Sequence, residues 1–218
     1  MTLSDTTKTI VPAAGSLSYL ALGDSYTIGE AVAQDQSFPF QLMERMNGQG
    51  FKVGAPKIIA TTGWTTSELQ SGIKAAKPAV KYDIVTLLIG VNNQYRGNSI
   101  DIYRTEFKDL LQQAIGFAGG NVNHVFVISI PDWGATPFGK RSGRGEQHIA
   151  KEIDAFNALN KEESLKAGVN YTDITPESRN ASTDPSLVAT DGLHPSGKMY
   201  KEWVDLLVPA VLKQYQVK

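Results

Sequence analysis

The most specific chemical pattern lies near the C-terminus, in the segment Asp191-Gly192-Leu193-His194-Pro195. Asp191 precedes His194 by three residues, and Gly192 lies between them. This spacing allows the Asp191 carboxylate to fold back onto the His194 imidazole. Pro195 restricts His194 to an extended backbone and favours the start of a helix after it. A lone histidine is more often structural, but here a carboxylate and a stiff joint accompany it. The segment therefore favours a histidine general base oriented by an acid.

Three further polar segments each follow a short apolar run. They are Gly23-Asp24-Ser25-Tyr26, Thr61-Thr62-Gly63-Trp64-Thr65 and Gly90-Val91-Asn92-Asn93. Taken singly, each segment is typical of an ordinary turn or helix cap. Taken with a nearby base, Ser25 has the hydroxyl of a nucleophile. Gly63 has a backbone N–H and Asn92 a side-chain amide, and both are donors suited to an oxyanion.

These segments need a scaffold, and the hydropathy pattern predicts one. Apolar runs typical of strands span residues 19–22, 57–60, 84–89 and 125–130, with a weaker fifth at 169–174. The run from Asp83 to Gly90 is nearly all apolar and rich in β-branched residues, as in a parallel strand buried on both faces.

Segments of helical period separate these runs. We expect helices over 37–47, capped by Ser37, over 66–77, ending before Pro78, and along apolar stripes at 103–118 and 149–159. The last of these helices should end by Gly168. A final helix should open at Pro195, with Pro209 kinking or interrupting it.

Alternating strands and helices predict an α/β fold, in which a parallel sheet of about five strands has helices on both faces and right-handed crossovers. Ligands of such sheets bind beyond the carboxyl ends of the strands. The polar segments after the strands should therefore meet at one edge. We expect residues 1–16 to form a loose leader and residues 17–218 a single domain.

Composition excludes several functions. The net charge of −1, without a lysine or arginine cluster, argues against a nucleic-acid partner. The absence of cysteine excludes disulfides, thiolate zinc sites and cysteine nucleophiles.

No apolar run approaches the roughly 20 residues of a transmembrane segment. No signal peptide is visible, so the chain as given is expected to be cytoplasmic, or exported if a signal peptide has been removed. Oligomeric state is not indicated.

The four polar segments, in this order, resemble the conserved blocks of the SGNH hydrolase family, also called the GDSL lipase or esterase family. The resemblance spans Gly23 to Ser196. Two positions depart from the family pattern. Thr61 stands where an asparagine is common, and Asn93 stands where an aspartate is common; the latter should affect local hydrogen bonding rather than the chemistry.

The resemblance implies a flavodoxin-like three-layer α/β/α sandwich and a serine esterase that needs no metal or organic cofactor. It implies that Ser25 is the nucleophile, activated by His194 and Asp191. The N–H groups of Ser25 and Gly63 and the amide of Asn92 would form the oxyanion hole. The partner would be a small-molecule ester: a short-chain ester, a lysophospholipid or an acetylated carbohydrate, with a small acyl group favoured.

Four other interpretations of the sequence were weighed against particular residues, and two of them stay open. An acyltransferase would use the same site, and an inert binding module would keep the fold without the chemistry. An α/β-hydrolase needs Gly-x-Ser-x-Gly, but Thr27 stands in place of the second glycine. A dinucleotide binder needs Gly-x-Gly-x-x-Gly, which the first turn lacks.

The remaining candidates have simpler expectations. His124 and His148 are expected to be surface residues. Four aromatic residues near strand ends are expected to line a pocket or to pack under loops: Trp64, Tyr95, Trp133 and Phe138.

Overall fold

The structure is a computed structural model that describes residues 16–79 and 81–215. The expected leader, residues 1–16, therefore lies outside the described residues except for Ser16. Within these residues, five parallel strands form one sheet in the order β2-β1-β3-β4-β5. The strands are β1 (Tyr19–Gly23), β2 (Lys57–Ala60), β3 (Ile84–Leu88), β4 (Val125–Ile128) and β5 (Asn170–Thr172).

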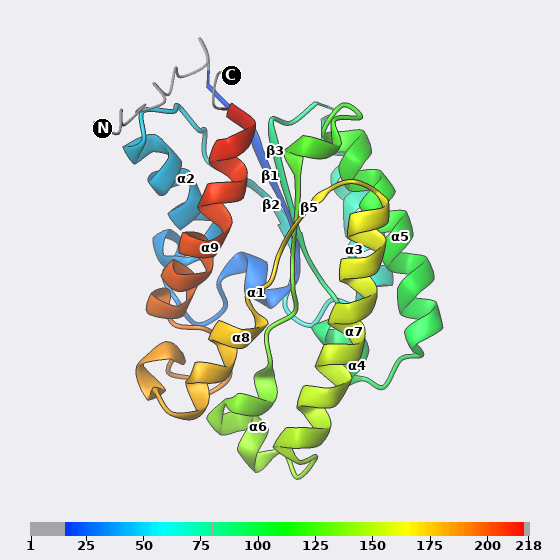
Figure 1. Cartoon of the computed structure of the whole chain (residues 1–218), viewed down its shortest axis with the longest axis vertical. Coiled ribbons are helices and arrows are strands. Elements are labelled where there is room, and N and C mark those ends of the chain that lie inside the picture. Colours follow the sequence, from blue (N-terminus) through cyan, green and yellow to red (C-terminus); the bar gives the residue numbers. More distant parts are fainter. Residues whose placement is uncertain (1–15, 80, 216–218) are drawn as a thin grey trace, which may run out of the picture.

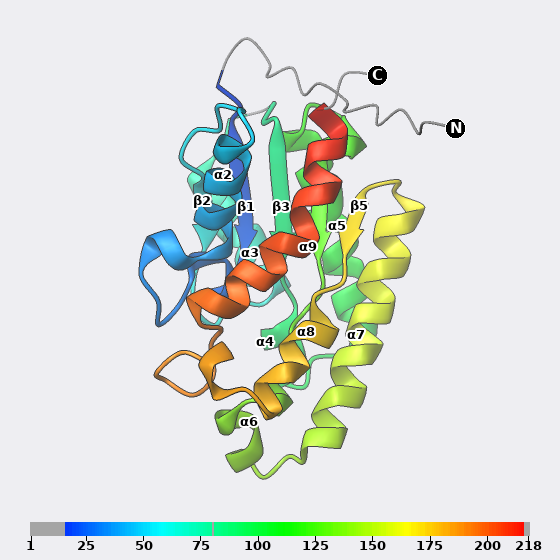
Figure 2. The same cartoon turned by 60° about the vertical axis from the view of Figure 1, so that its left-hand side comes forward.

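Helices cover both faces of the sheet (Figure 1, Figure 2). On one face lie α2 (Phe38–Gly48) and α9 (Gly197–Tyr215); on the other lie α3 (Thr66–Ala76), α5 (Ile100–Phe117) and α7 (Glu146–Lys166). Short helices at the carboxyl edge of the sheet are α1 (Ser25–Ile28), α4 (Val91–Tyr95), α6 (Pro137–Arg141) and α8 (Thr175–Ser178). The predicted three-layer α/β/α sandwich is confirmed.

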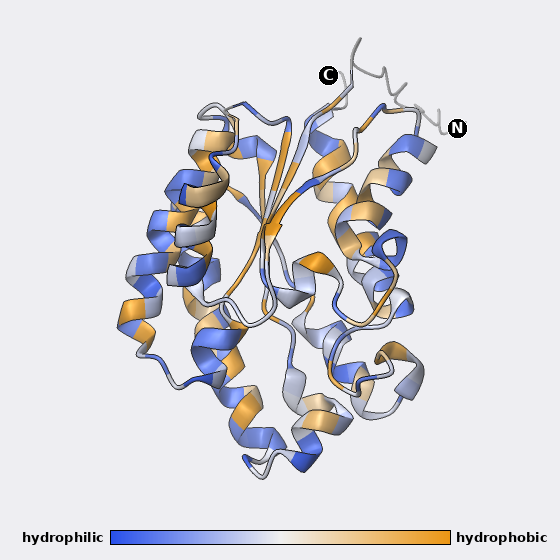
Figure 3. Cartoon of the chain, turned by 180° about the vertical axis from the view of Figure 1, so that it is seen from behind, coloured by the Kyte–Doolittle hydropathy of each residue, from blue (hydrophilic) through white to orange (hydrophobic). Residues whose placement is uncertain are grey.

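Burial explains this arrangement. Every residue of β1, β3 and β4 is buried. Figure 3 shows the apolar strands at the centre, with hydrophilic residues on the outer helix surfaces. The stripe predicted for 103–118 lies on α5, where Tyr103, Phe107 and Leu110 are almost fully buried. Apolar burial is the dominant favourable term in folding. The same apolar residues that predicted the strands and helices therefore also hold the layers together.

Some predicted helix ends were wrong. Ser37 sits at the N-cap of α2, but its hydroxyl donates to the carbonyl of Gln34 at 2.8 Å instead of capping the helix. The short 3₁₀ turn η1 (Gln34–Gln36) brings that carbonyl within reach. The last helix begins at Gly197 rather than Pro195, because Pro195 forms an antiparallel bridge with Val188.

Pro209 does not interrupt α9, which continues to Tyr215. Proline removes one backbone donor and leaves the carbonyl four residues earlier without its helical partner. Pro209 is exposed and Asp205 is only half-buried. Water can therefore serve the freed carbonyl, and the helix persists.

The turn between β1 and α1 is tightly packed at Gly23. A Cβ at this position would overlap the backbone carbonyl of Leu88 on β3 and the hydroxyl of Thr27 on α1. Only glycine therefore allows β1, β3 and α1 to approach this closely.

We expect Gly23→Ala to lower the free energy of unfolding by about 1–3 kcal/mol, because the added methyl overpacks a junction that includes backbone. Urea unfolding measures the change. Gly48→Ala is the matched control, since Gly48 is exposed at the end of α2 and a Cβ there meets nothing within 4 Å. Equal stability of the two variants would contradict the packing argument.

Candidate active site

Ser25 is the first residue of α1, directly after β1, and is 5% exposed. Asp24 is the N-cap of this helix, and its Oδ1 accepts a hydrogen bond from the Tyr26 N–H at 3.0 Å. The turn thus holds Ser25 at the carboxyl edge of the sheet. No hydrogen bond of the described residues uses the Ser25 hydroxyl, and catalytic hydrogen bonds are often long before substrate binds.

Asp191 holds His194 through both carboxylate oxygens. Asp191 Oδ2 lies 2.5 Å from His194 Nδ1, while Oδ1 accepts the N–H groups of Leu193 at 2.9 Å and His194 at 3.0 Å. Burial acts to raise the pKa of Asp191, but these hydrogen bonds outweigh it and bring the pKa below its ordinary value. The carboxylate therefore stays ionised beside the ring.

The loop that carries this pair is tied down on both sides. Ala189 N–H donates to the His194 carbonyl at 2.8 Å, and Ser196 N–H donates to the Leu187 carbonyl at 2.9 Å. From α6, the Phe138 N–H donates to the Gly192 carbonyl at 2.8 Å. The imidazole is thus positioned by the backbone as well as by Asp191.

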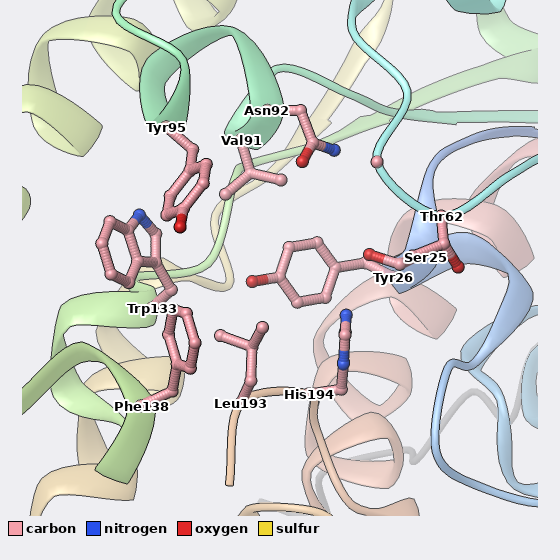
Figure 4. Close-up of a pocket in the computed structure, with 11 residues that line it drawn as sticks. Ser25, Tyr26, Thr62, Val91, Asn92, Tyr95, Trp133, Phe138, Leu193 and His194 are labelled. Carbon is pink, nitrogen blue, oxygen red and sulfur yellow. The ribbon is translucent and has the colours of Figure 1, made fainter. Parts of the chain in front are cut away.

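One pocket brings the predicted residues together. Ser25, Gly63, Asn92 and His194 all line a cavity of about 210 Å³ at the carboxyl edge of the sheet (Figure 4). Asp191 stands behind His194, on the far ring nitrogen, and is not part of the lining. Four segments far apart in the sequence therefore converge on one cavity.

The backbone at Gly63 is suited to donating into the pocket. Its φ of +84° is a conformation that favours glycine. Arg96 fixes the turn from outside by donating to the Gly63 carbonyl at 2.5 Å. Within the described residues, the N–H groups of Gly63 and Ser25 donate to no other protein group.

Asn92 and its neighbour Asn93 have different tasks. Asn92 lines the pocket, and its Nδ2 donates to the Trp64 carbonyl at 3.0 Å and lies 3.5 Å from Asp24 Oδ2. Asn93 is buried and forms two hydrogen bonds with Thr66. It accepts one from the Thr66 N–H at 3.0 Å and donates one to the Thr66 hydroxyl at 2.7 Å. Asn93 therefore joins α4 to α3, in keeping with the predicted local role.

The rest of the pocket is mainly apolar. We call the group lining this part the apolar arm: Val91, Tyr95, Trp133, Phe138 and Leu193. Figure 4 shows Tyr95, Trp133 and Phe138 lined up across the pocket from Ser25. Trp64, the fourth aromatic candidate, instead packs against Gly72, where a Cβ would overlap its ring.

Sequence reasoning missed four pocket residues, Tyr26, Thr62, Val91 and Leu193. Each is adjacent to a predicted site residue, so its position was the available signal. The Tyr26 ring packs edge-on against His194, with ring centroids 5.7 Å apart. Burial raises the pKa of Tyr26 well above its ordinary value, so its hydroxyl stays protonated.

The other two histidines lie away from the pocket lining. His148 is exposed, as expected, and pairs with Glu152 at 3.2 Å. His124 is half-buried, contrary to expectation, because its ring stacks on Tyr215 from α9 with centroids 5.5 Å apart. Burial lowers the pKa of His124.

Residues 16–79 and 81–215 contain neither a metal-binding cluster nor a membrane-spanning helix. No group of three or more His, Asp or Glu side chains is arranged to hold a metal ion. None of the helices in these ranges is long and apolar enough to cross a membrane.

Comparison with known families gives one match. Residues 21–202 match the model of the GDSL-like Lipase/Acylhydrolase family, which is most of the chain. None of the curated protein sequences matches the chain significantly.

Solved structures with the same fold include three esterases and lipases. A lipase/acylhydrolase from Enterococcus faecalis is 20% identical, with a TM-score of 0.66 over 93% of this chain and 98% of its own. The psychrotrophic esterase EstA from Pseudoalteromonas sp., solved with monoethylphosphonate as inhibitor, is 15% identical, with a TM-score of 0.64 over 90% and 97%. The acetyl xylan esterase AlAXEase is 13% identical, with a TM-score of 0.68 over 89% and 100%. At these identities the likeness concerns the fold.

A pH-dependent stability follows from Asp24, which is completely buried. Burial raises its pKa from 3.8 to about 7. Between these values the unfolded chain releases the Asp24 proton while the folded chain keeps it, so stability falls as pH rises through this window. Above about pH 7 both states are ionised, and the penalty is constant.

We therefore expect Asp24→Asn to gain stability relative to wild type as the pH rises from 4 to 7, with no further gain above 7. Urea unfolding of both proteins across this range measures the difference. Any cost of the amide itself is the same at every pH, so only the slope matters. A difference that does not change with pH would rule out a buried, protonated Asp24.

Proposed function

Because the chain belongs to the GDSL-like lipase/acylhydrolase family and is therefore a carboxylic ester hydrolase, we propose that it cleaves its ester through an acyl-enzyme on Ser25. One observation carries the proposal. Ser25 and His194 share a pocket with an apolar arm, while an ionised Asp191 holds the far nitrogen of the imidazole. These are the parts that a serine nucleophile requires.

In the first half of the reaction, Ser25 Oγ attacks the ester carbonyl carbon as His194 Nε2 takes the hydroxyl proton. Asp191 accepts the Nδ1 hydrogen bond, which fixes the tautomer and stabilises the imidazolium that forms. The tetrahedral intermediate then expels the alkoxide, which receives the same proton from His194. In the second half, water repeats these steps on the acyl-enzyme and releases the acid.

The oxyanion of each tetrahedral intermediate needs donors placed in advance. We assign this role to the N–H groups of Ser25 and Gly63 and to the Asn92 amide. The two N–H groups have no acceptor within the described residues, which supports their availability. Asn92 Nδ2 gives one hydrogen to the Trp64 carbonyl at 3.0 Å, and its other hydrogen faces Asp24 Oδ2 at a long 3.5 Å. In the proposal this longer contact gives way to the oxyanion when the tetrahedral intermediate forms.

The pocket supports a small acyl group. Its volume of about 210 Å³ is below the roughly 300–1,000 Å³ typical of sites for drug-sized ligands. The apolar arm suits a short hydrocarbon chain, and the opposite side of the pocket, near Thr62 and Asn92, is polar. Among the ester classes considered, a short-chain ester or an acetylated alcohol fits this space better than a lysophospholipid.

The decisive experiment compares wild type with Ser25→Ala on p-nitrophenyl acetate. We expect turnover to fall by at least ~10³-fold, because the variant lacks the hydroxyl that attacks the ester in the proposed mechanism. Ser71→Ala is the matched control, since Ser71 is exposed on α3 and bonds only to the Ser67 carbonyl. Retained activity in folded Ser25→Ala would refute the mechanism.

The same assay tests the competing functions. An acyltransferase would pass the acetyl group to an added alcohol in preference to water, which product analysis detects. Wild type that neither hydrolyses nor transfers any ester of a broad panel would be an inert member of the fold.

For Asn92→Ala we expect kcat to fall by about 10²–10³ with little change in KM, because the lost donor acts mainly on the transition state. Steady-state kinetics on p-nitrophenyl acetate measure both constants. Near-UV circular dichroism checks that the variant keeps its tertiary packing. An unchanged kcat in the folded variant would remove Asn92 from the oxyanion hole.

A further inference from the structure

The aromatic wall of the apolar arm is supported from behind by a chain of polar bonds. Trp133 is 2% exposed and lies between Tyr95 and Phe138, with ring centroids 5.3 and 6.0 Å away. Its indole Nε1 donates to Gln94 Oε1 at 2.7 Å, and Gln94 Nε2 donates to Glu152 Oε2 at 2.6 Å. This series of hydrogen bonds thus links Trp133 in the pocket wall to Gln94 on α4 and to Glu152 on α7.

Arg144 closes this chain from the loop between α6 and α7. Its guanidinium donates to Glu152 Oε2 at 2.9 Å and to the Tyr95 carbonyl at 2.9 Å. The same group lies 5.6 Å from the Trp133 ring and 5.8 Å from the Tyr95 ring. A single arginine therefore contacts both aromatic residues and the carboxylate that supports them.

We propose that Gln94, Arg144 and Glu152, which we call the clasp, fix the aromatic wall and thereby limit the length of acyl group that the site accepts. This inference rests on the proposed function, because it takes the apolar arm as the acyl site. The clasp residues are positioning residues, since they act through Trp133 and Tyr95.

The chemistry of the bonds makes the wall stiff. A buried indole N–H needs an acceptor, and losing it costs the desolvation of that group. The Glu152 carboxylate accepts a hydrogen bond from Gln94, so Gln94 presents its NH₂ there and its carbonyl oxygen to Trp133. Arg144 keeps Glu152 in place and neutralises its charge. Each member thus determines the orientation of the next.

The position of the clasp separates it from the catalytic groups. Among the described residues that line the pocket, Tyr95 and Trp133 bond to the clasp, whereas Ser25 and His194 do not. Loosening the clasp should therefore move the end of the acyl site and leave the chemistry at the ester carbonyl intact. The preferred acyl length should therefore change when the clasp is weakened, while kcat on the shortest ester should not.

The test measures kcat and KM of wild type and Arg144→Met on p-nitrophenyl acetate, butyrate, hexanoate and octanoate. Methionine keeps an apolar side chain but loses the charge and both hydrogen bonds. We expect kcat/KM for the longer esters, relative to acetate, to rise about tenfold through KM, because the variant loses the hydrogen bonds to Glu152 and to the Tyr95 carbonyl that hold the wall. The acetate kcat should stay within about twofold.

Two further variants make the result specific. Arg45→Met removes an exposed ion pair with Asp205 on the α2–α9 face and should keep the wild-type profile. Arg144→Lys keeps the charge but not the two-pronged contact, so it should fall between wild type and Arg144→Met. A wild-type profile in folded Arg144→Met, or an equal loss on every ester, would overturn the proposal.

A second readout does not depend on activity. The indole N–H of Trp133 can be followed by NMR hydrogen exchange, with Trp133→Phe identifying its signal. We expect exchange about tenfold faster in Arg144→Met than in wild type or Arg45→Met. If the wild type cleaves no ester, the proposed function fails, but the exchange rate still tests whether the clasp holds Trp133. An unchanged exchange rate in Arg144→Met would overturn the role of the clasp.

Discussion

The parallel pairing of three strands determines where everything else in the site can lie. In the sheet register, Gly23 of β1 stands opposite both Ala60 of β2 and Leu88 of β3. The three strands therefore end level with one another. The segments that follow them emerge side by side and bring Ser25, Gly63 and Asn92 to the same edge. A shift of register in any one pair would remove Ser25, Gly63 or Asn92 from the pocket.

Two aspartates beside this edge show how local environment divides acid–base roles. Asp24 is completely buried, and burial raises its pKa to about 7. Asp191 is partly exposed and accepts three hydrogen bonds, which lower its pKa. Only Asp191 is thus reliably ionised and placed to stabilise a histidine cation. Asp24 serves the turn instead, as the cap that presents Ser25.

The sequence predicted the sheet, its helices and the convergence of the site residues, because each depended on a local or periodic signal. Strand runs, helical stripes and the Asp191–His194 spacing can all be seen within a few residues. The errors arose where another contact replaced the one that the pattern predicted. Ser37 bonds backward to Gln34, and Pro195 pairs with Val188 before the helix begins. The aromatic residues allowed two interpretations, because only the fold separates Trp133 from Trp64.

The two sides of the pocket are therefore built on different principles. The side that carries Ser25, Gly63 and Asn92 follows from backbone turns at strand ends, which any chain with this sheet and these motifs can reproduce. The apolar side depends on side chains such as Trp133, Gln94 and Glu152, whose pairing leaves no periodic trace in the sequence. The likeness to solved structures that are 13–20% identical concerns the fold that carries these turns. Their fold thus extends to this chain, whereas the choice of acyl group must be read from its own side chains.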